Sequence, residues 1–424
     1  MACASAPPTQ SPPPALTFIE DDPERAFAEA RSTGKPIFVD TWALWCHSCL
    51  ALKSEVLTDP SLARFDAQFV WLSLDVERAS AAPFLERFPQ PAYPTLWILR
   101  PDGTPLLRWV GTLTAPQLAE LLTDALVAHS GAPASATSRK LLEAEGLAAE
   151  GKPDEAIAAY RETLAMAPPD WPRRSRTANA LLFMLIKHEQ PEACLATALA
   201  EVPRSKPGDA GRPDLVIGGI GCATSLPASD ATRQALETLA PLARDIANDP
   251  SMLGDDRSGA WAALVDADKA LGRDQVATYA AWITFLESRE AAKTPEQRQV
   301  FDMHRMYAYL GAKRPDDAIE VLEQSARDFP DDYNPPARKA YVYLETARYD
   351  LALVEINRAL SLVYGPRRLR VRAMQATIHE KRGDPAAARE ALQQALREAD
   401  ALPPAQRPTK LIADLTKRLA TLTP

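Results

Sequence analysis

Two cysteines separated by two residues are the strongest chemical signal in this sequence. Cys46 and Cys49 lie in the run Trp45-Cys46-His47-Ser48-Cys49, after a predicted buried strand and at the start of a predicted helix. A thiol at a helix N-terminus is stabilised as the thiolate by the helix dipole and by unpaired backbone N–H groups. Cys49, one turn later on the same face, can attack a mixed disulfide formed by Cys46. The spacing predicts a redox-active dithiol, with Cys46 as nucleophile and Cys49 as resolving thiol.

A Cys-x-x-Cys pair is also half of a common metal site. No second Cys/His pair stands at ligand spacing, so we predict no metal site and no cofactor beyond the Cys46–Cys49 disulfide itself. The other cysteines are too few and too scattered for a disulfide framework. We expect Cys194 and Cys222 to be small buried core residues rather than disulfide partners. Four histidines have no partner at catalytic spacing, and we assign them to helix surfaces: His129, His188, His304 and His379.

The elements that must position the dithiol alternate between strands and helices. Apolar patterns predict strands at 37–40, 69–74, 95–99 and 106–110 and helices at 23–32, 83–87 and 117–129. Leu50, Leu52 and Val56 form the apolar stripe of the helix that carries the cysteines. Asp102-Gly103 is a hairpin turn signal between the last two strands. These elements predict an α/β domain with a mixed sheet.

Three segments of this domain resemble the thioredoxin family. They are Lys35 to Cys49, Ala92 to Leu96, and Val110-Gly111. In that family the counterpart of Pro94 is a cis-proline packed against the two sulfurs, and the residue before it pairs with the substrate backbone. The resemblance therefore implies a cis bond at this proline, the exception even for X–Pro bonds. The substrate-docking surface that it implies consists of Trp45, His47, Ser48, Tyr93, Pro94 and Thr95.

The resemblance also implies a buried proton acceptor. Asp40 matches the family's buried acid beneath the second cysteine. A carboxylate whose pKa is raised by burial can take the Cys49 proton as that thiol attacks. Two positions depart from the family: Leu50 and Trp71 stand where thioredoxins carry lysines, and the second of these lysines pairs with the buried acid.

The residues between the cysteines depart from the family as well. His47 and Ser48 replace the Gly-Pro of thioredoxin, and a protonated histidine beside Cys46 would stabilise its thiolate and make the pair more oxidising. The helix at 23–32 and the run from Leu57 to Leu62 make the domain similar to the C-terminal domain of bacterial transmembrane thiol:disulfide interchange proteins. This resemblance covers about a quarter of the chain.

From about Thr137 onward the sequence is helical and partly self-similar. A buried-type alanine recurs at 318, 352 and 388, at spacings of 34 and 36 residues, within segments that resemble the tetratricopeptide repeat. In that repeat the small residue lets two antiparallel helices approach closely. The region from Arg173 to Lys293 is off-pattern, and we expect divergent helical hairpins there. The α/β domain is thus predicted to be followed by an all-α solenoid of tetratricopeptide-like repeats.

We divide the chain into four regions: a flexible Pro/Ser-rich tether at 1–15, the thioredoxin-like domain at 16–130, divergent helical repeats at 131–295 with a first unit at about 138–168, and tetratricopeptide-like repeats at 296–424. Cys3 follows a small residue at the start of the tether, and this arrangement resembles the mature start of a bacterial lipoprotein. The resemblance implies a lipid anchor at Cys3 and a place in the cell envelope or periplasm. The alternative is a cytoplasmic protein.

Composition excludes several classes of function. The formal net charge is -8 with both signs mixed throughout, which leaves no basic footprint for nucleic acid. No apolar run approaches the roughly 18 residues of a membrane span.

The sequence as a whole predicts a thiol–disulfide oxidoreductase of the reductase or interchange type that acts on protein disulfides, with repeats that recruit a protein partner on their concave surface. The alternative is a repeat adaptor whose thioredoxin fold is a binding or redox-sensing module.

Overall fold

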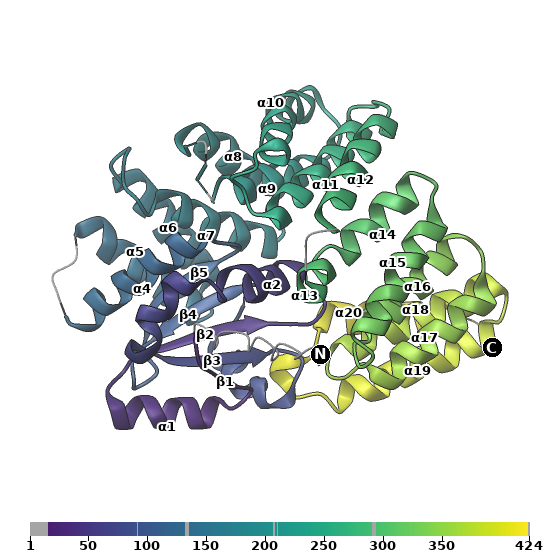
Figure 1. The fold of residues 1–424 in the computed structure, drawn as a ribbon, viewed down its shortest axis with the longest axis horizontal. Coiled ribbons are helices and arrows are strands. Elements are labelled where there is room, and N and C mark those ends of the chain that lie inside the picture. Colours follow the sequence, from purple (N-terminus) through teal and green to yellow (C-terminus); the bar gives the residue numbers. More distant parts are fainter. Residues whose placement is uncertain are drawn as a thin grey trace, which may run out of the picture.

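The computed structural model describes residues 16–90, 92–131, 135–206, 208–209, 211–290 and 294–422. It has two parts, which we call the sheet domain (18–129) and the helical arm (136–421) (Figure 1). An α/β fold followed by an all-α array was predicted, and this organisation is confirmed. The predicted tether at 1–15, including Cys3, lies outside the described residues.

The sheet domain is built on a mixed five-stranded sheet. Its strands are β1 (Phe18–Glu20), β2 (Ile37–Trp42), β3 (Val70–Asp75), β4 (Thr95–Leu99) and β5 (Pro105–Val110), in the order β1-β3-β2-β4-β5. β3 runs parallel to β1 and β2, whereas β4 runs antiparallel to β2 and β5. The sequence analysis did not predict β1, because three residues are too few to show an alternating pattern. The strand that leads to the cysteines, β2, is central.

Helices cover both faces of the sheet. They are α1 (Pro23–Thr33), α2 (His47–Ala51), the π-helical η1 (Leu52–Val56), the 3-10 helices η2 (Pro60–Gln68) and η3 (Ala79–Ala81), α3 (Ala82–Arg87) and α4 (Ala115–His129). Alternate β2 side chains enter opposite cores, as the pleat requires. Phe38 packs in the core that contains α4, whereas Ile37 and Val39 pack in the core that contains α1 and α3.

The helical arm consists of consecutive helices that pack against their neighbours in the chain. They are α5 (Ala136–Ala149), α6 (Pro153–Met166), α7 (Arg174–Lys187), α8 (Pro191–Glu201), η4 (Val202–Arg204), α9 (Arg212–Ser225), α10 (Asp230–Asn248), α11 (Gly254–Ala270), α12 (Val276–Glu290), α13 (Pro295–Gln299), α14 (Asp302–Gly311), α15 (Pro315–Asp328), α16 (Asn334–Glu345), α17 (Tyr349–Leu362), α18 (Arg367–Arg382), α19 (Pro385–Asp400), η5 (Pro404–Gln406) and α20 (Thr409–Thr421). The recurring alanines Ala318, Ala352 and Ala388 are fully buried, as a close helix–helix approach requires. None of the helices in the described part of the chain is both long and apolar enough to cross a membrane.

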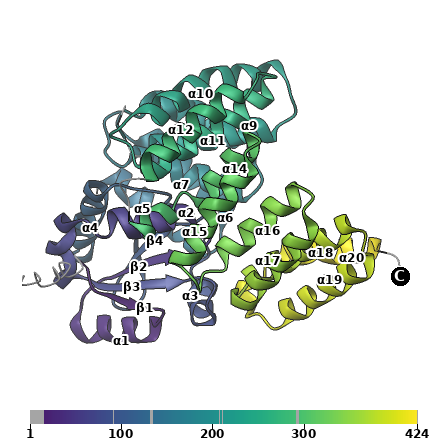
Figure 2. The ribbon, with the colours of Figure 1, turned by 45° about the vertical axis from the view of Figure 1, so that its right-hand side comes forward.

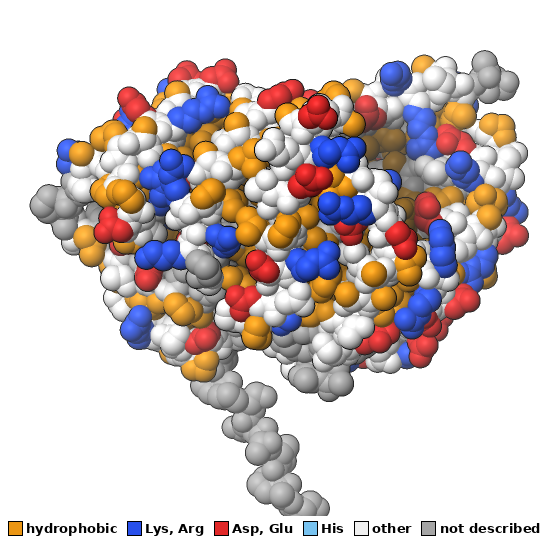
Figure 3. Space-filling view, turned by 90° about the horizontal axis from the view of Figure 1, so that it is seen from above, with side chains coloured by type: hydrophobic (Ala, Val, Ile, Leu, Met, Phe, Trp, Pro, Cys, Tyr) orange, Lys and Arg blue, Asp and Glu red, His pale blue; other side chains and the backbone are white. Residues whose placement is uncertain are grey.

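The arm curves around the sheet domain instead of extending away from it (Figures 1 and 2). At its start, α5 and α7 cover the edge strand β5: the Arg108 N–H donates to Glu145 Oε2 at 3.0 Å, and Arg176 Nε donates to the Arg108 carbonyl at 3.1 Å. These contacts satisfy backbone groups that an exposed edge would leave open. Near its end, Gln406 Nε2 donates to the carbonyls of Val76 and Arg78 at 2.7 and 2.8 Å. Charges of both signs are interspersed over the face drawn in Figure 3.

A disulfide joins α8 to α9 in the arm. Cys194 and Cys222 are buried as expected, but they are bonded to each other, so the prediction of two separate thiols was wrong. The two helices approach closely because Gly219 has no side chain at their contact: a Cβ built there would lie 2.8 Å from the Ala198 Cβ. Cysteines 28 residues apart gave no pairing signal in the sequence.

Candidate active site

The dithiol lies where the central strand meets a helix. After β2 the chain turns, and Cys46 is the N-cap of α2: its sulfur accepts a hydrogen bond from the Cys49 backbone N–H at 3.2 Å. The two cysteines form a disulfide. Cys46 is 5% exposed and Cys49 is fully buried. The helix N-terminus therefore points its partial positive charge at the sulfur that the sequence analysis assigned as nucleophile.

The predicted docking loop lies beside the dithiol. The Tyr93–Pro94 bond is cis, as expected. Trp45 and Tyr93 join the cysteines and Val76 in one apolar cluster, and the rings of Trp45 and Tyr93 meet edge to face at 5.7 Å. Thr95 is buried, and its hydroxyl donates to the Ala92 carbonyl at 2.7 Å. The structure thus places Trp45 and Tyr93 against the two cysteines.

Asp40 is fully buried in the middle of β2, and neither carboxylate oxygen has a hydrogen-bond partner among the described residues. Burial raises its pKa to about 6, against the lowering effect of Lys53, whose Nζ lies 3.7 Å from Oδ2. That amine also donates to Ser73 Oγ at 2.7 Å. Trp71 takes no part, since its indole N–H donates to the Asp66 carbonyl. Although Trp71 stands where the family has a lysine, Asp40 still has a cation beside it, because Lys53 of η1 supplies one.

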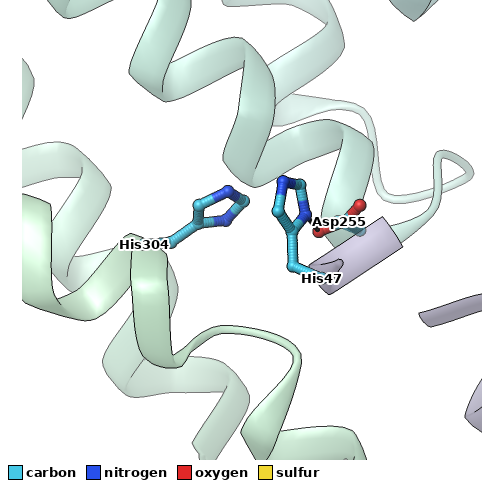
Figure 4. A group of neighbouring side chains, drawn as sticks. All are labelled: His47, Asp255 and His304. Carbon is cyan, nitrogen blue, oxygen red and sulfur yellow. Dashed lines mark hydrogen bonds and ion pairs between the residues drawn. The ribbon is translucent and has the colours of Figure 1, made fainter. Parts of the chain in front are cut away.

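The histidine of the motif is paired with a residue of the arm. His47 Nδ1 lies 2.7 Å from Asp255 Oδ1 at the start of α11, and the His304 ring from α14 packs against the His47 ring with centroids 4.5 Å apart (Figure 4). Asp255 is 3% and His304 4% exposed. The assignment of His304 to a helix surface was therefore wrong. Ser48 Oγ lies 3.3 Å from the same His47 nitrogen.

These three residues are also a group whose donor atoms could hold a metal ion, since one atom from each lies within 4.8 Å of the others. Zinc ligands at about 2.1 Å in a tetrahedron stand about 3.4 Å apart. The 2.7 Å between His47 Nδ1 and Asp255 Oδ1 is instead the length of a charge-assisted hydrogen bond. We therefore describe the group as an ion pair beside a second imidazole.

The charges of this group follow from their surroundings. Burial alone would lower the pKa of His47, but the charge of Asp255 and its hydrogen bond outweigh this and raise it. Burial, together with the nearby His47 charge, lowers the pKa of His304 to about 3, so that ring is neutral near pH 7. An imidazolium next in the chain to Cys46 stabilises the Cys46 thiolate. The arm thus contributes to the electrostatics of the dithiol.

We predict that Asp255→Asn makes the dithiol more reducing. Without the carboxylate, the pKa of the buried His47 falls and the imidazole becomes neutral near pH 7. The reduced form then loses stabilisation of its thiolate, and the reduction potential should fall by about 30 mV, equivalent to about 1.4 kcal/mol. Equilibration in glutathione buffers measures this shift. Asp268→Asn is the matched control, because it removes another buried carboxylate of α11, one that accepts from Thr278. Equal potentials in both variants and the wild type would contradict the assignment.

Other contacts cover the side of the dithiol that faces the arm. Trp45 Nε1 donates to Glu77 Oε1 at 2.8 Å, and the Arg367 guanidinium stacks on the Trp45 ring at 5.1 Å. The Arg367 backbone N–H also donates to Glu77 Oε2. Burial raises the pKa of Glu77, and these two donors oppose that shift. The residues flanking Cys46 are therefore held between the two parts of the protein.

The sequence analysis did not predict the residues outside the Cys-x-x-Cys motif that contact the site. Lys53 stands four residues after Cys49, a spacing that places both on one helix face, so this residue could have been found. Asp255, His304 and Arg367 had no such signal. They lie more than 200 residues from the motif, and only the path of the arm brings them to it.

Comparisons with known proteins find relatives of the N-terminal part of the chain. A family model described as Thioredoxin-like matches residues 19–101. The thiol:disulfide interchange protein DsbD 1 of Pseudomonas aeruginosa is 34% identical over 106 residues, which are 24% of this chain and 18% of that protein. A thioredoxin of Mycolicibacterium smegmatis is 33% identical over 94 residues, 22% of this chain and 81% of that protein. The solved structure of a tetratricopeptide repeat protein from Parabacteroides merdae covers 67% of this chain and 99% of its own, with 9% identity and a TM-score of 0.44.

Proposed function

Because the chain belongs to the thioredoxin family through its N-terminal domain, we propose that it is a thiol–disulfide oxidoreductase of the reductase or interchange type. The observation that carries the proposal is the Cys46–Cys49 pair at the N-terminus of α2, beside the cis Tyr93–Pro94 bond. A purely structural disulfide would need neither a thiolate-stabilising helix end nor a buried acid nearby. The similarity to an interchange protein supports the same chemistry.

In the proposed reaction the reduced dithiol transfers two electrons to a disulfide. The Cys46 thiolate attacks one sulfur of the substrate, forms a mixed disulfide and releases the first thiol. Cys49 then attacks Cys46 Sγ, which closes the protein disulfide and releases the second thiol. Asp40, with its pKa near 6, accepts the Cys49 proton during this second step.

The reduction potential of the pair tests the proposal. The protein is equilibrated in glutathione and dithiothreitol buffers, and the Cys46–Cys49 state is read by alkylation and mass. A value near or below about -250 mV indicates a reductase, and about -120 to -180 mV an oxidase or isomerase with His47 as the cause. No reversible couple at all would contradict the proposal and favour the adaptor, in which the sheet domain serves as a binding or redox-sensing module.

We also propose a place in the bacterial cell envelope, with a lipid on Cys3 and a protein partner on the repeats. The similarity to an interchange protein and the sequence around Cys3 support this location. Mass spectrometry of the N-terminal peptide from the natively expressed protein tests it, since an unmodified Cys3 thiol would contradict the anchor. The cytoplasm is the alternative location.

A further inference from the structure

A small cavity lies where the arm meets the sheet domain at Trp45. Its volume is about 220 Å³, and Trp45, the residue before Cys46, forms one wall. The remaining lining comes from α14, α16 and α18 and from Tyr333, the residue before α16. Pockets for drug-sized ligands hold about 300–1,000 Å³, so this cavity accepts a side chain or a short polar arm of a molecule. Through Trp45 it adjoins the residue that precedes Cys46, the proposed nucleophile, whose side chain is only 5% exposed.

The polar lining of the cavity is cationic. The described lining residues include Arg338, Arg367 and Arg370 and no acidic side chain. Burial lowers the pKa of Arg367; Tyr333 and Glu77 oppose this shift, whereas the charges of Arg370 and Arg338 add to it. Arg370 is exposed. Three positively charged side chains around a small cavity form a site for an anion.

Carboxylates lie near these cations, namely those of Asp302, Asp332 and Glu77. Asp332, which interacts with the charge of Arg338, also accepts hydrogen bonds from Gln299 and Asn334. Asp302 Oδ2 lies 3.6 Å from Arg338 Nη1, and its other oxygen lies 3.4 Å from Arg305 Nη1. Glu77 accepts from the backbone N–H of Arg367. Each of these acids is therefore shared with another donor.

Two buried polar atoms of the cavity wall have no hydrogen-bond partner among the described residues. They are the hydroxyl of Tyr333, which is 1% exposed, and Nη1 of Arg338, which is 8% exposed. Buried donors are satisfied in the great majority of cases, so the Tyr333 hydroxyl needs an explanation, whereas Arg338 Nη1 has an ion-pair partner in Asp302 without a hydrogen bond to it. A carboxylate in the cavity supplies the acceptor that the Tyr333 hydroxyl lacks and can also accept charge-assisted hydrogen bonds from the guanidinium groups.

We propose that this cavity binds a carboxylate of a small disulfide substrate and so presents the substrate's sulfurs to Cys46. The inference rests on the proposed oxidoreductase function and adds a substrate class to it: low-molecular-weight disulfides that carry carboxylates. The arm packs against the faces of Trp45 and His47 where a folded protein would otherwise dock. The cavity volume fits one carboxylate-bearing arm of a flexible molecule.

The step needs no further reagent when the protein starts reduced. The Cys46 thiolate forms a bond to one substrate sulfur while the substrate S–S bond breaks and one thiol leaves. Cys49 then displaces the second thiol, so two electrons pass from the protein to the substrate. The carboxylate in the cavity is unchanged and serves only to hold the substrate.

Single-turnover kinetics test the proposal. Reduced protein, freed of dithiothreitol, is mixed with anionic glutathione disulfide, neutral hydroxyethyl disulfide or cationic cystamine, and oxidation is followed by tryptophan fluorescence. Each rate constant is divided by the rate constant of free dithiothreitol with the same disulfide. We expect the ratio of the normalised rate constant for glutathione disulfide to that for hydroxyethyl disulfide to be highest at low ionic strength. This ratio should fall with added salt. Cystamine should react most slowly.

Arg370→Glu is the decisive variant, because an exposed side chain can change without loss of folding. It should lower that ratio by about tenfold, since one attraction is replaced by a repulsion of similar size. It should also raise the relative rate of cystamine. Arg358→Glu, which changes an exposed arginine of α17 outside the cavity, is the matched control and should leave the ratio as in the wild type.

The possible outcomes separate the two levels of the proposal. An unchanged ratio in Arg370→Glu, or cystamine as the fastest substrate of the wild type, would overturn the anionic site. A folded protein disulfide that reacts faster than glutathione disulfide would overturn the small-substrate inference in favour of a protein client. If none of the disulfides oxidises the reduced protein, the proposed oxidoreductase function itself fails.

Discussion

Cys46→Ser is expected to abolish thiol–disulfide exchange, whereas Cys49→Ser is expected to stop the reaction at the mixed disulfide. Cys46 is the N-cap of α2, so the helix end stabilises its thiolate and makes it the attacking group. Cys49 lies deeper, fully buried, and can only resolve the bond that Cys46 has formed. Steady-state turnover should fall to background in both variants. Mass spectrometry should detect a substrate adduct in Cys49→Ser alone.

The arm offers a control for this pair. Cys194→Ala combined with Cys222→Ala removes a disulfide that joins two helices of the arm and should retain exchange. An adduct that accumulates in Cys46→Ser instead of Cys49→Ser would reverse the assigned roles. Full turnover without Cys46 would contradict the dithiol mechanism.

Asp40→Asn is expected to slow the resolving step by about 100-fold, within the range of a lost general base. The buried carboxylate has a pKa of about 6 and is unprotonated at pH 7.5, so it can accept the Cys49 proton. Asparagine keeps the shape of the side chain but cannot accept that proton. Stopped-flow measurement of mixed-disulfide decay reports the change. A decay rate equal to that of the wild type at pH 7.5 would exclude Asp40 from proton transfer.

The same substitution is expected to stabilise the protein at neutral pH. The pKa of Asp40 is raised from 3.8 to about 6 on folding, so the folded state holds the proton more tightly than the unfolded state. The wild type therefore loses stability as the pH rises from about 4 to about 6, by up to about 3 kcal/mol. Asparagine does not ionise, so Asp40→Asn should be more stable by up to this amount at pH 7.5.

Urea unfolding of both proteins at several pH values measures this difference. The stability gain of Asp40→Asn should shrink as the pH falls and should vanish below about pH 4, where the aspartic acid is protonated in both states. Comparing the two proteins at each pH cancels the titration of all other groups. A gain that is the same at pH 4 and pH 7.5 would show that burial of the charge is not its cause.

Local patterns in the sequence were sufficient for the elements of the sheet domain. Strands and helices there follow from apolar periodicity over neighbouring residues, which is why β2 and α4 lie close to their predicted positions. The strand β1 was missed because three residues carry no period. In the arm, the recurring alanines predicted close-packed helices because each repeat buries the same small side chain against its neighbour.

The candidate site likewise has a part that the sequence predicted and a part that it did not. The sequence alone predicted the dithiol from the spacing of Cys46 and Cys49, and its resemblance to the thioredoxin family implied the buried acid at Asp40 and the cis bond at Pro94. Only the tertiary structure decided what lies around them: the Asp255 partner of His47, the neutral His304 and the cationic cavity next to Trp45. These contacts join residues more than 200 positions apart. They depend on how far each of many helices turns the arm, a sum of small packing angles that no local pattern in the chain encodes.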